Sequence, residues 1–310
     1  MLLIVLLHTT YASFGYPDTL NQTNILILIF SSLSIYAVDV FILISGYFGV
    51  KPKKKSIVNL LFICFFACIC RIIVDLFFGN FSLSKLLFIS RSNWFIISYL
   101  GLLIVSPILN TYIELASKKQ FAILISGFFC YTIYFSIFPR QADIEPGFNN
   151  GCSLIWFIEV YLIGRYLKLY GLPVILRKYS AILLALSIIV IFLGQIAFVK
   201  LGYINRLAWW GAQNQPLVLL AALSLFAQFF RINITSNCVN WIAQSTLMVL
   251  LIHSPVLTKN YFNFISTKYS DNLLFVALLW IVGVCLIYCI CTIVDQIRLI
   301  IYKKLIETHL

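Results

Sequence analysis

The chain has 310 residues, of which 62% are hydrophobic and only 10% are charged, and its mean hydropathy is +1.00. A soluble domain of this length could not bury so much apolar surface, so a soluble protein is excluded. The formal net charge of +12 would suggest nucleic acid in a soluble protein. Here the Lys and Arg residues lie in short segments between apolar runs, so the charge indicates membrane orientation and no nucleic-acid partner is expected.

Apolar runs recur along the whole chain, most of them near the roughly 20 residues that cross a bilayer as a helix. They predict an all-α, polytopic integral membrane protein with about ten transmembrane helices in a single domain over residues 1–310. The expected spans are 1–14, 30–50, 56–78, 93–113, 120–138, 152–169, 179–200, 213–230, 239–257 and 273–300. The first is too short to cross alone, because 14 residues rise only about 20 Å.

Basic residues between the spans predict the orientation. The side that holds Lys51, Lys53, Lys54 and Lys55, with which Arg298 near the end of the last span is counted, carries about twice as many Lys and Arg residues as the opposite side. By the positive-inside rule this side is cytoplasmic, so both termini are expected in the cytoplasm.

Five ionisable side chains interrupt the apolar spans: His8, Asp39, Arg71, Glu159 and His253. Counting about 1.5 Å of rise per residue places all five in the outer half of the bilayer. Such residues are costly in hydrocarbon and therefore indicate function. One interpretation is a polar cavity, open to the outer side, in which His8 exchanges a proton. The other is a buried bridge from Arg71 to Glu159 or Asp39 that only stabilises helix packing.

The lysine run between the second and third spans also has two interpretations. Lys51, Lys53, Lys54 and Lys55 can anchor the chain to anionic lipid. They can also bind the phosphates of a nucleotide-bearing donor at the cytoplasmic side, with Lys118 and Lys119 contributing.

Nine cysteines invite a search for a metal site or disulfides. Seven lie within the apolar spans, with no nearby cluster of His or carboxylate residues: Cys64, Cys68, Cys70, Cys130, Cys285, Cys289 and Cys291. They are predicted to be small buried hydrophobic residues, and no metal is expected.

Four segments, in order, resemble the membrane acyltransferase 3 family, whose members O-acylate surface sugars. The first is a His in the first span followed by VDVFILISGYF, and the second is WFIISYL ending at Ser106-Pro107. The others are YLIGRY at residues 161–166 and QSTL…LIH ending at His253. Each motif alone is weak, whereas four in order cover nearly the whole chain.

The resemblance implies transfer of an acyl group, usually acetyl from acetyl-CoA, to a hydroxyl of an envelope glycan or lipid-linked sugar. The expected location is the bacterial inner membrane, with acyl-CoA as donor and no bound cofactor. His8 matches the family's first-span His and is implied to be the catalytic base. Asp39 or Glu159 is then expected to orient His8, and Arg71 to stabilise the oxyanion, with His253 in the same polar site.

The sequence departs from the family pattern in two places. The family has an Arg about ten residues before its His, whereas only seven residues precede His8. This predicts that about ten or more N-terminal residues are missing. In addition, Lys51 to Lys55 replace the family's arginines, and lysine binds phosphate without the bidentate fork.

Two rival functions stay open. A transporter or flippase for lipid-linked sugars would also show ten helices and charges inside the membrane, although the sequence shows no matching halves and no paired broken helices. An inactive, truncated family member is the other alternative.

Overall fold

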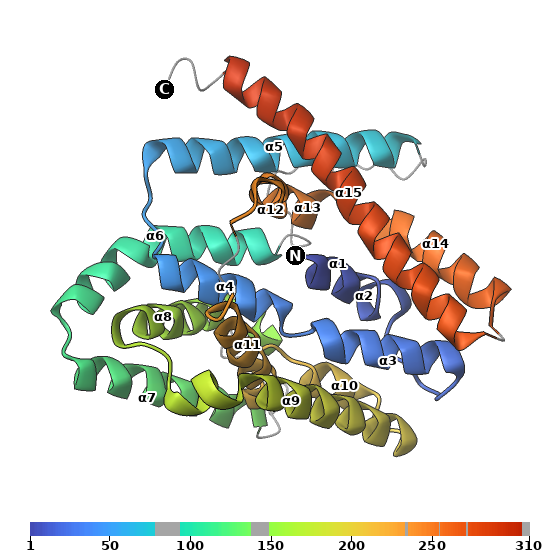
Figure 1. The fold of residues 1–310 in the computed structure, drawn as a ribbon, viewed down its shortest axis with the longest axis horizontal. Helices are drawn as coiled ribbons and strands as arrows, with labels where there is room; N and C mark the ends of the chain where they lie inside the picture. Colours follow the sequence, from blue (N-terminus) through green and yellow to red (C-terminus); the bar gives the residue numbers. More distant parts are fainter. Residues whose placement is uncertain (78–93, 138–148, 233–234, 254, 271, 306–310) are drawn as a thin grey trace.

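A computed structural model describes residues 1–77, 94–137, 149–232, 235–253, 255–270 and 272–305. Within these residues the regular structure is helical, as predicted (Figure 1). The helices are α1 (Leu2–His8), α2 (Tyr11–Phe14), α3 (Gln22–Ser34), α4 (Ala37–Phe48), α5 (Lys54–Phe77), α6 (Trp94–Leu115), α7 (Lys118–Ile137), the 3-10 turn η3 (Asn149–Gly151), α8 (Leu154–Tyr170), α9 (Val174–Lys200), α10 (Asn205–Trp210), α11 (Pro216–Phe229), α12 (Asn237–Ala243), α13 (Thr246–Ile252), α14 (Pro255–Lys268) and α15 (Leu273–Leu305).

Among the described residues, five helical segments are long and apolar enough to cross a membrane. They are Gln22–Phe48, which joins α3 to α4, and α5, α6, α9 and α15. On α9 and α15 one face is exposed although it is apolar, as at Leu193 and Ile290, which suits contact with lipid. A multi-pass membrane protein is therefore supported, while ten spans with cytoplasmic termini stay a prediction.

Several expected span limits are wrong. The segment expected at 30–50 begins at Gln22, because the polar run before it is a helix start. There Asn21 caps the helix, its side chain accepting a hydrogen bond of 2.8 Å from the Asn24 amide. The segment expected at 239–257 is interrupted at Gln244–Ser245 and again after Ile252, giving α12, α13 and α14. Interrupted helices are therefore present, although a single continuous span was expected here.

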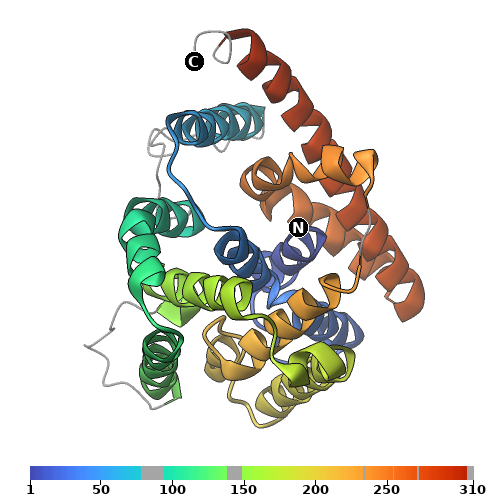
Figure 2. The same cartoon turned by 60° about the vertical axis from the view of Figure 1, so that its left-hand side comes forward.

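Helix α1 lies in the middle of the molecule. In both views the N-terminus is central, whereas the carboxyl end of α15 lies at the edge (Figures 1 and 2). Helix α1 contacts α3, α4 and α15, and its residues Ile4 and Val5 are buried in two different hydrophobic clusters. A segment too short to cross a bilayer alone is thus held by its neighbours.

Helices α4 and α8 pack closely against one another at two glycines. A Cβ atom at Gly164 would lie 2.5 Å from the Leu43 carbonyl oxygen, and one at Gly46 would lie 2.4 Å from that of Tyr161. Both glycines come from the motif segments SGYF and YLIGRY. Small residues let the backbones of membrane helices approach closely, so these motif positions have a packing role.

A further motif residue, Pro107, lies inside α6. Proline has no amide hydrogen, so the carbonyl of Leu103, four residues earlier, loses its helical partner. The Ser106 hydroxyl donates a hydrogen bond of 2.8 Å to that carbonyl. The Ser-Pro pair therefore supplies its own replacement donor, as irregular backbone within a membrane requires.

Arg298, counted among the basic residues of the cytoplasmic side, is buried inside α15 and pairs with Asp295 at 2.5 Å. The expectation that the cysteines of the apolar runs are buried is wrong for most of them. Only Cys64 and Cys291 are buried among the cysteines; Cys130, Cys285 and Cys289 lie on exposed faces of α7 and α15. Hydrocarbon outside the protein accepts a thiol as readily as a protein core does, so an apolar run does not predict which face is buried.

Candidate active site

The end of α1 holds His8 in a fixed position. His8 is the last residue of the helix, where the final carbonyls have no helical partner. The Thr9 and Thr10 amides bond to the Leu6 and Leu7 carbonyls at 3.1 Å. Three hydroxyls add to these bonds: Thr9 donates to the Leu6 carbonyl at 2.7 Å, Thr10 to the Leu7 carbonyl at 2.6 Å, and Ser13 to the His8 carbonyl at 2.8 Å. The backbone polar groups around His8 are thus satisfied without water.

A buried tryptophan connects this helix end to α15. The Trp280 indole donates a hydrogen bond of 2.9 Å to the Thr9 hydroxyl. Its ring is fully buried and contacts Phe14, Phe30 and Phe262, with ring centroids 4.8–5.6 Å apart. Aromatic packing of this kind makes the end of α1 rigid. The Thr-Thr pair directly after His8 is the sequence signal for this arrangement.

His253 also stands at a helix end. It follows the last residue of α13 and has an extended backbone, with ψ of 108°. Pro255, two residues later, cannot continue the hydrogen-bonded pattern, which explains why the helix ends here. The His253 ring turns back onto its own helix, and its Nδ1 lies 2.5 Å from the Val249 carbonyl oxygen.

The two histidines meet although they are far apart in sequence. Nδ1 of His8 lies 2.5 Å from Nε2 of His253. The ring centroids are 4.6 Å apart and the planes are inclined by 28°, so the nitrogen atoms lie much closer together than the ring centres. The rings therefore approach edge to edge, which suits a hydrogen bond. His8 is half-buried, whereas His253 is buried.

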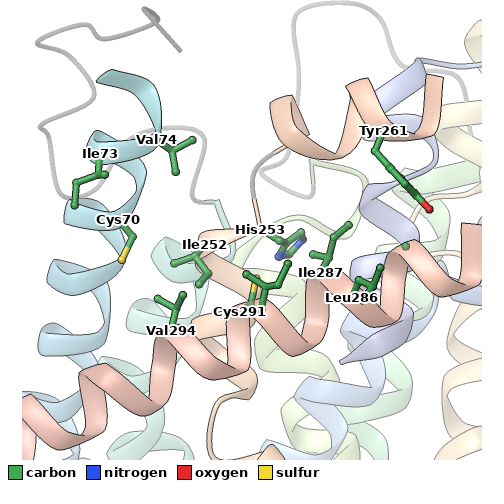
Figure 3. A pocket seen from close by; sticks show the side chains of 12 residues that line it. Cys70, Ile73, Val74, Ile252, His253, Tyr261, Leu286, Ile287, Cys291 and Val294 are labelled. Atoms are coloured by element: carbon green, nitrogen blue, oxygen red, sulfur yellow. The ribbon is translucent and has the colours of Figure 1, made fainter. Parts of the chain in front are cut away.

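A cavity of about 550 Å³ opens beside His253 (Figure 3). Residues of α5, including Cys70 and Val74, line one side, and Tyr261 of α14 and Leu286 of α15 line the other. The walls are apolar apart from a few groups such as the His253 ring. Arg71 follows the lining residue Cys70 on α5. Among the five predicted residues, the structure thus brings His8 and His253 into contact.

Asp39 and Glu159 form a second buried group, on the packed pair α4 and α8. Asp39 accepts a hydrogen bond of 2.9 Å from the Trp156 indole, and Glu159 accepts one of 2.8 Å from the Thr132 hydroxyl. The second oxygen of each carboxyl group has no hydrogen-bond partner among the described residues. The place beside His8 that was expected for a carboxylate is taken by His253.

The lysine run lies at the amino end of α5 and is held by side chains of α6 and α8. The Val50 amide donates to the Tyr161 hydroxyl at 3.3 Å, and that hydroxyl donates to Asn110 at 2.6 Å. The Asn110 amide returns a bond of 3.0 Å to the Val50 carbonyl. Tyr161, another motif residue, thus positions the segment that carries the lysines.

The lysines themselves are exposed: Lys51, Lys53, Lys54 and Lys55. A helix carries a partial positive charge at its amino end, so lysines there add to a charge of the same sign. Such a concentration of positive charge favours an anion nearby, whether a phosphate or an anionic lipid headgroup.

The comparisons with known proteins agree with the motifs. A family model described as an acyltransferase domain matches residues 1–295. Neither a search of characterised proteins nor a search of solved structures finds a match.

Proposed function

Because the chain belongs to the acyltransferase 3 family and is a membrane acyltransferase, we propose that His8 is its catalytic base. The acyl group, acetyl in the simplest case, comes from acyl-CoA at the cytoplasmic side. The acceptor is a hydroxyl of an envelope glycan or a lipid-linked sugar, and the location is a bacterial inner membrane. The observation that carries the proposal is a half-buried imidazole at a helix end whose backbone carbonyls are hydrogen-bonded, itself hydrogen-bonded to a second imidazole.

The chemistry needs one base and one leaving thiol. A nitrogen of His8 takes the proton of the sugar hydroxyl while its oxygen attacks the thioester carbonyl. The tetrahedral intermediate then expels the CoA thiolate, which takes the proton back from the imidazolium and leaves as CoA-SH. Arg71 is the cation closest in sequence to the cavity lining, and we assign it the stabilisation of the oxyanion. Asp39 and Glu159 are assigned a role in helix packing, through their hydrogen bonds to Trp156 and Thr132.

The donor must reach from the lysines to the histidines. Lys54 and Arg71 lie on the same helix, and their separation corresponds to about 25 Å at 1.5 Å per residue. A donor with phosphates at Lys51 to Lys55 therefore needs a long, thin arm running along α5. Coenzyme A, with its charged nucleotide at one end and its thioester at the other, meets this requirement.

A comparison of strains tests the proposed function. Surface glycan from the producing strain and from a deletion strain is compared by NMR, and the O-acetyl methyl signals are expected to disappear on deletion while the glycan backbone is still exported. The interrupted helices favour a transporter as the second candidate, since many transporters bind substrate at such breaks. Unexported glycan that keeps its O-acyl groups in the deletion strain would support the transporter and contradict the enzyme.

Changing Lys51, Lys53, Lys54 and Lys55 to Gln together is expected to raise the KM for acyl-CoA about tenfold or more, with kcat little changed. Loss of phosphate contacts worth about 1.4 kcal/mol suffices for this factor. The measurement is acyl transfer by the purified protein in nanodiscs of neutral lipid. Changing Lys303 and Lys304 of α15 to Gln is the matched control, with no change in KM expected. An unchanged KM in the variant with all four lysines changed would contradict donor binding and favour a lipid anchor.

A further inference from the structure

The hydrogen bonds of the histidine pair determine where its protons lie. The Val249 carbonyl can only accept, so Nδ1 of His253 carries a hydrogen. In a neutral imidazole the other nitrogen then has the lone pair, so Nε2 of His253 accepts. Nδ1 of His8, 2.5 Å away, must be the donor to it. The remaining nitrogen of His8, Nε2, is left with the free lone pair.

We propose that His253 is a positioning residue, which holds His8 in the Nδ1–H tautomer and so makes Nε2 of His8 the basic atom. This inference rests on the proposed function, in which His8 is the base. An unpartnered imidazole in water places its proton mainly on Nε2, the nitrogen that must be free to take a proton from the sugar hydroxyl. A fixed acceptor at Nδ1 reverses that preference.

The same chain of bonds stabilises the charge that develops on His8. When Nε2 takes a proton, the imidazolium still donates from Nδ1 to His253, which in turn donates to the Val249 carbonyl. Both rings lie at carboxyl ends of helices, His8 on α1 and His253 after α13. Helix carboxyl ends carry partial negative charge and favour a cation.

A neutral orienting group suits this position. In many hydrolases a carboxylate orients the catalytic His, which places a permanent charge beside it. The cavity at His253 is walled mainly by apolar side chains, where an unpaired charge is costly. Asp39 and Glu159, the carboxylates that were expected to orient His8, are hydrogen-bonded to Trp156 and Thr132 instead. A second imidazole supplies the acceptor without the charge.

Two isosteric variants separate positioning from packing. His253→Gln keeps an acceptor where Nε2 faces His8, whereas His253→Asn keeps a donor toward Val249 and loses that acceptor. We expect kcat of the Gln variant to stay within about tenfold of the parent protein. The Asn variant is expected to lose about 100-fold in kcat, with KM unchanged, as removal of such orienting partners typically does. Equal activity of the two variants would overturn the proposal.

A spectroscopic readout tests the tautomer without activity. The chain has only three His residues, so 15N-histidine NMR in micelles can be assigned with single variants. His8 is expected to show a protonated Nδ1 and an unprotonated Nε2, and to change to the Nε2–H form in His253→Asn. An Nε2–H form of His8 in the parent protein would overturn the inference. Failure of the proposed function would appear differently: a His8 variant would keep full activity, while His8 of the parent protein would still show the Nδ1–H tautomer.

Discussion

Changing His8 to Ala is expected to lower the rate of acyl transfer by about 10²- to 10⁴-fold, the usual contribution of a positioned general base. This corresponds to roughly 3–5 kcal/mol of activation free energy. The loss is expected in kcat, because the imidazole acts on the proton that moves in the transition state and not on the bound donor. The measurement is release of CoA thiol by the purified protein, together with the O-acetyl signal of glycan from a complemented strain.

The variant His8→Asn is the matched control for structure. The amide nitrogen of Asn can donate to His253 much as Nδ1 of His8 does, but the side chain cannot take a proton. The helix end should persist in both variants, since Thr9, Thr10 and Ser13 bond to backbone carbonyls and not to the imidazole. His8→Asn is therefore expected to be as inactive as His8→Ala. Activity near that of the parent protein in either variant would remove His8 from the catalytic role.

The second large effect is expected at Gly164. A Cβ atom there would meet backbone atoms of α4: the Leu43 carbonyl oxygen at 2.5 Å, the Tyr47 amide at 2.9 Å and the Gly46 Cα at 3.0 Å. Backbone atoms cannot turn away as a side chain can, so α4 and α8 must separate. Gly164→Ala is expected to lower the free energy of unfolding by about 2–3 kcal/mol. The apparent Tm would then fall by roughly 5–10 °C.

Gly127 provides the matched control for helix propensity. It lies within α7, and a Cβ atom built there meets nothing within 4 Å. Gly127→Ala is therefore expected to be neutral or to stabilise by up to about 1 kcal/mol, since Ala is the better helix former. Both variants are heated in detergent and the folded fraction is followed by size-exclusion chromatography. Equal Tm values for Gly164→Ala and Gly127→Ala would show that the close approach of α4 and α8 contributes little to stability.

The motifs predicted the family without explaining what their residues do. Gly46 and Gly164 come from different motifs, and the structure shows that they face one another. Tyr161 holds the segment before the lysines, and Ser106 satisfies the carbonyl that Pro107 leaves free. Ser245, from the last motif, accepts a hydrogen bond of 3.1 Å from Gln296 of α15. These roles are contacts between segments far apart in sequence, which a motif does not record.

The residues alone predict a helical membrane protein of the acyltransferase 3 family with a His inside its first apolar segment. Apolar run length and ordered motifs are local properties, so they can be read from one chain. The packing of the helices shows what they do not: the first helix ends at His8, and His253, and neither Asp39 nor Glu159, is the hydrogen-bond partner of His8. In a soluble protein, the spacing of polar residues marks the face of each helix that packs inward. In a membrane both faces are apolar, so that spacing carries little information and the packing of whole helices decides which polar groups meet.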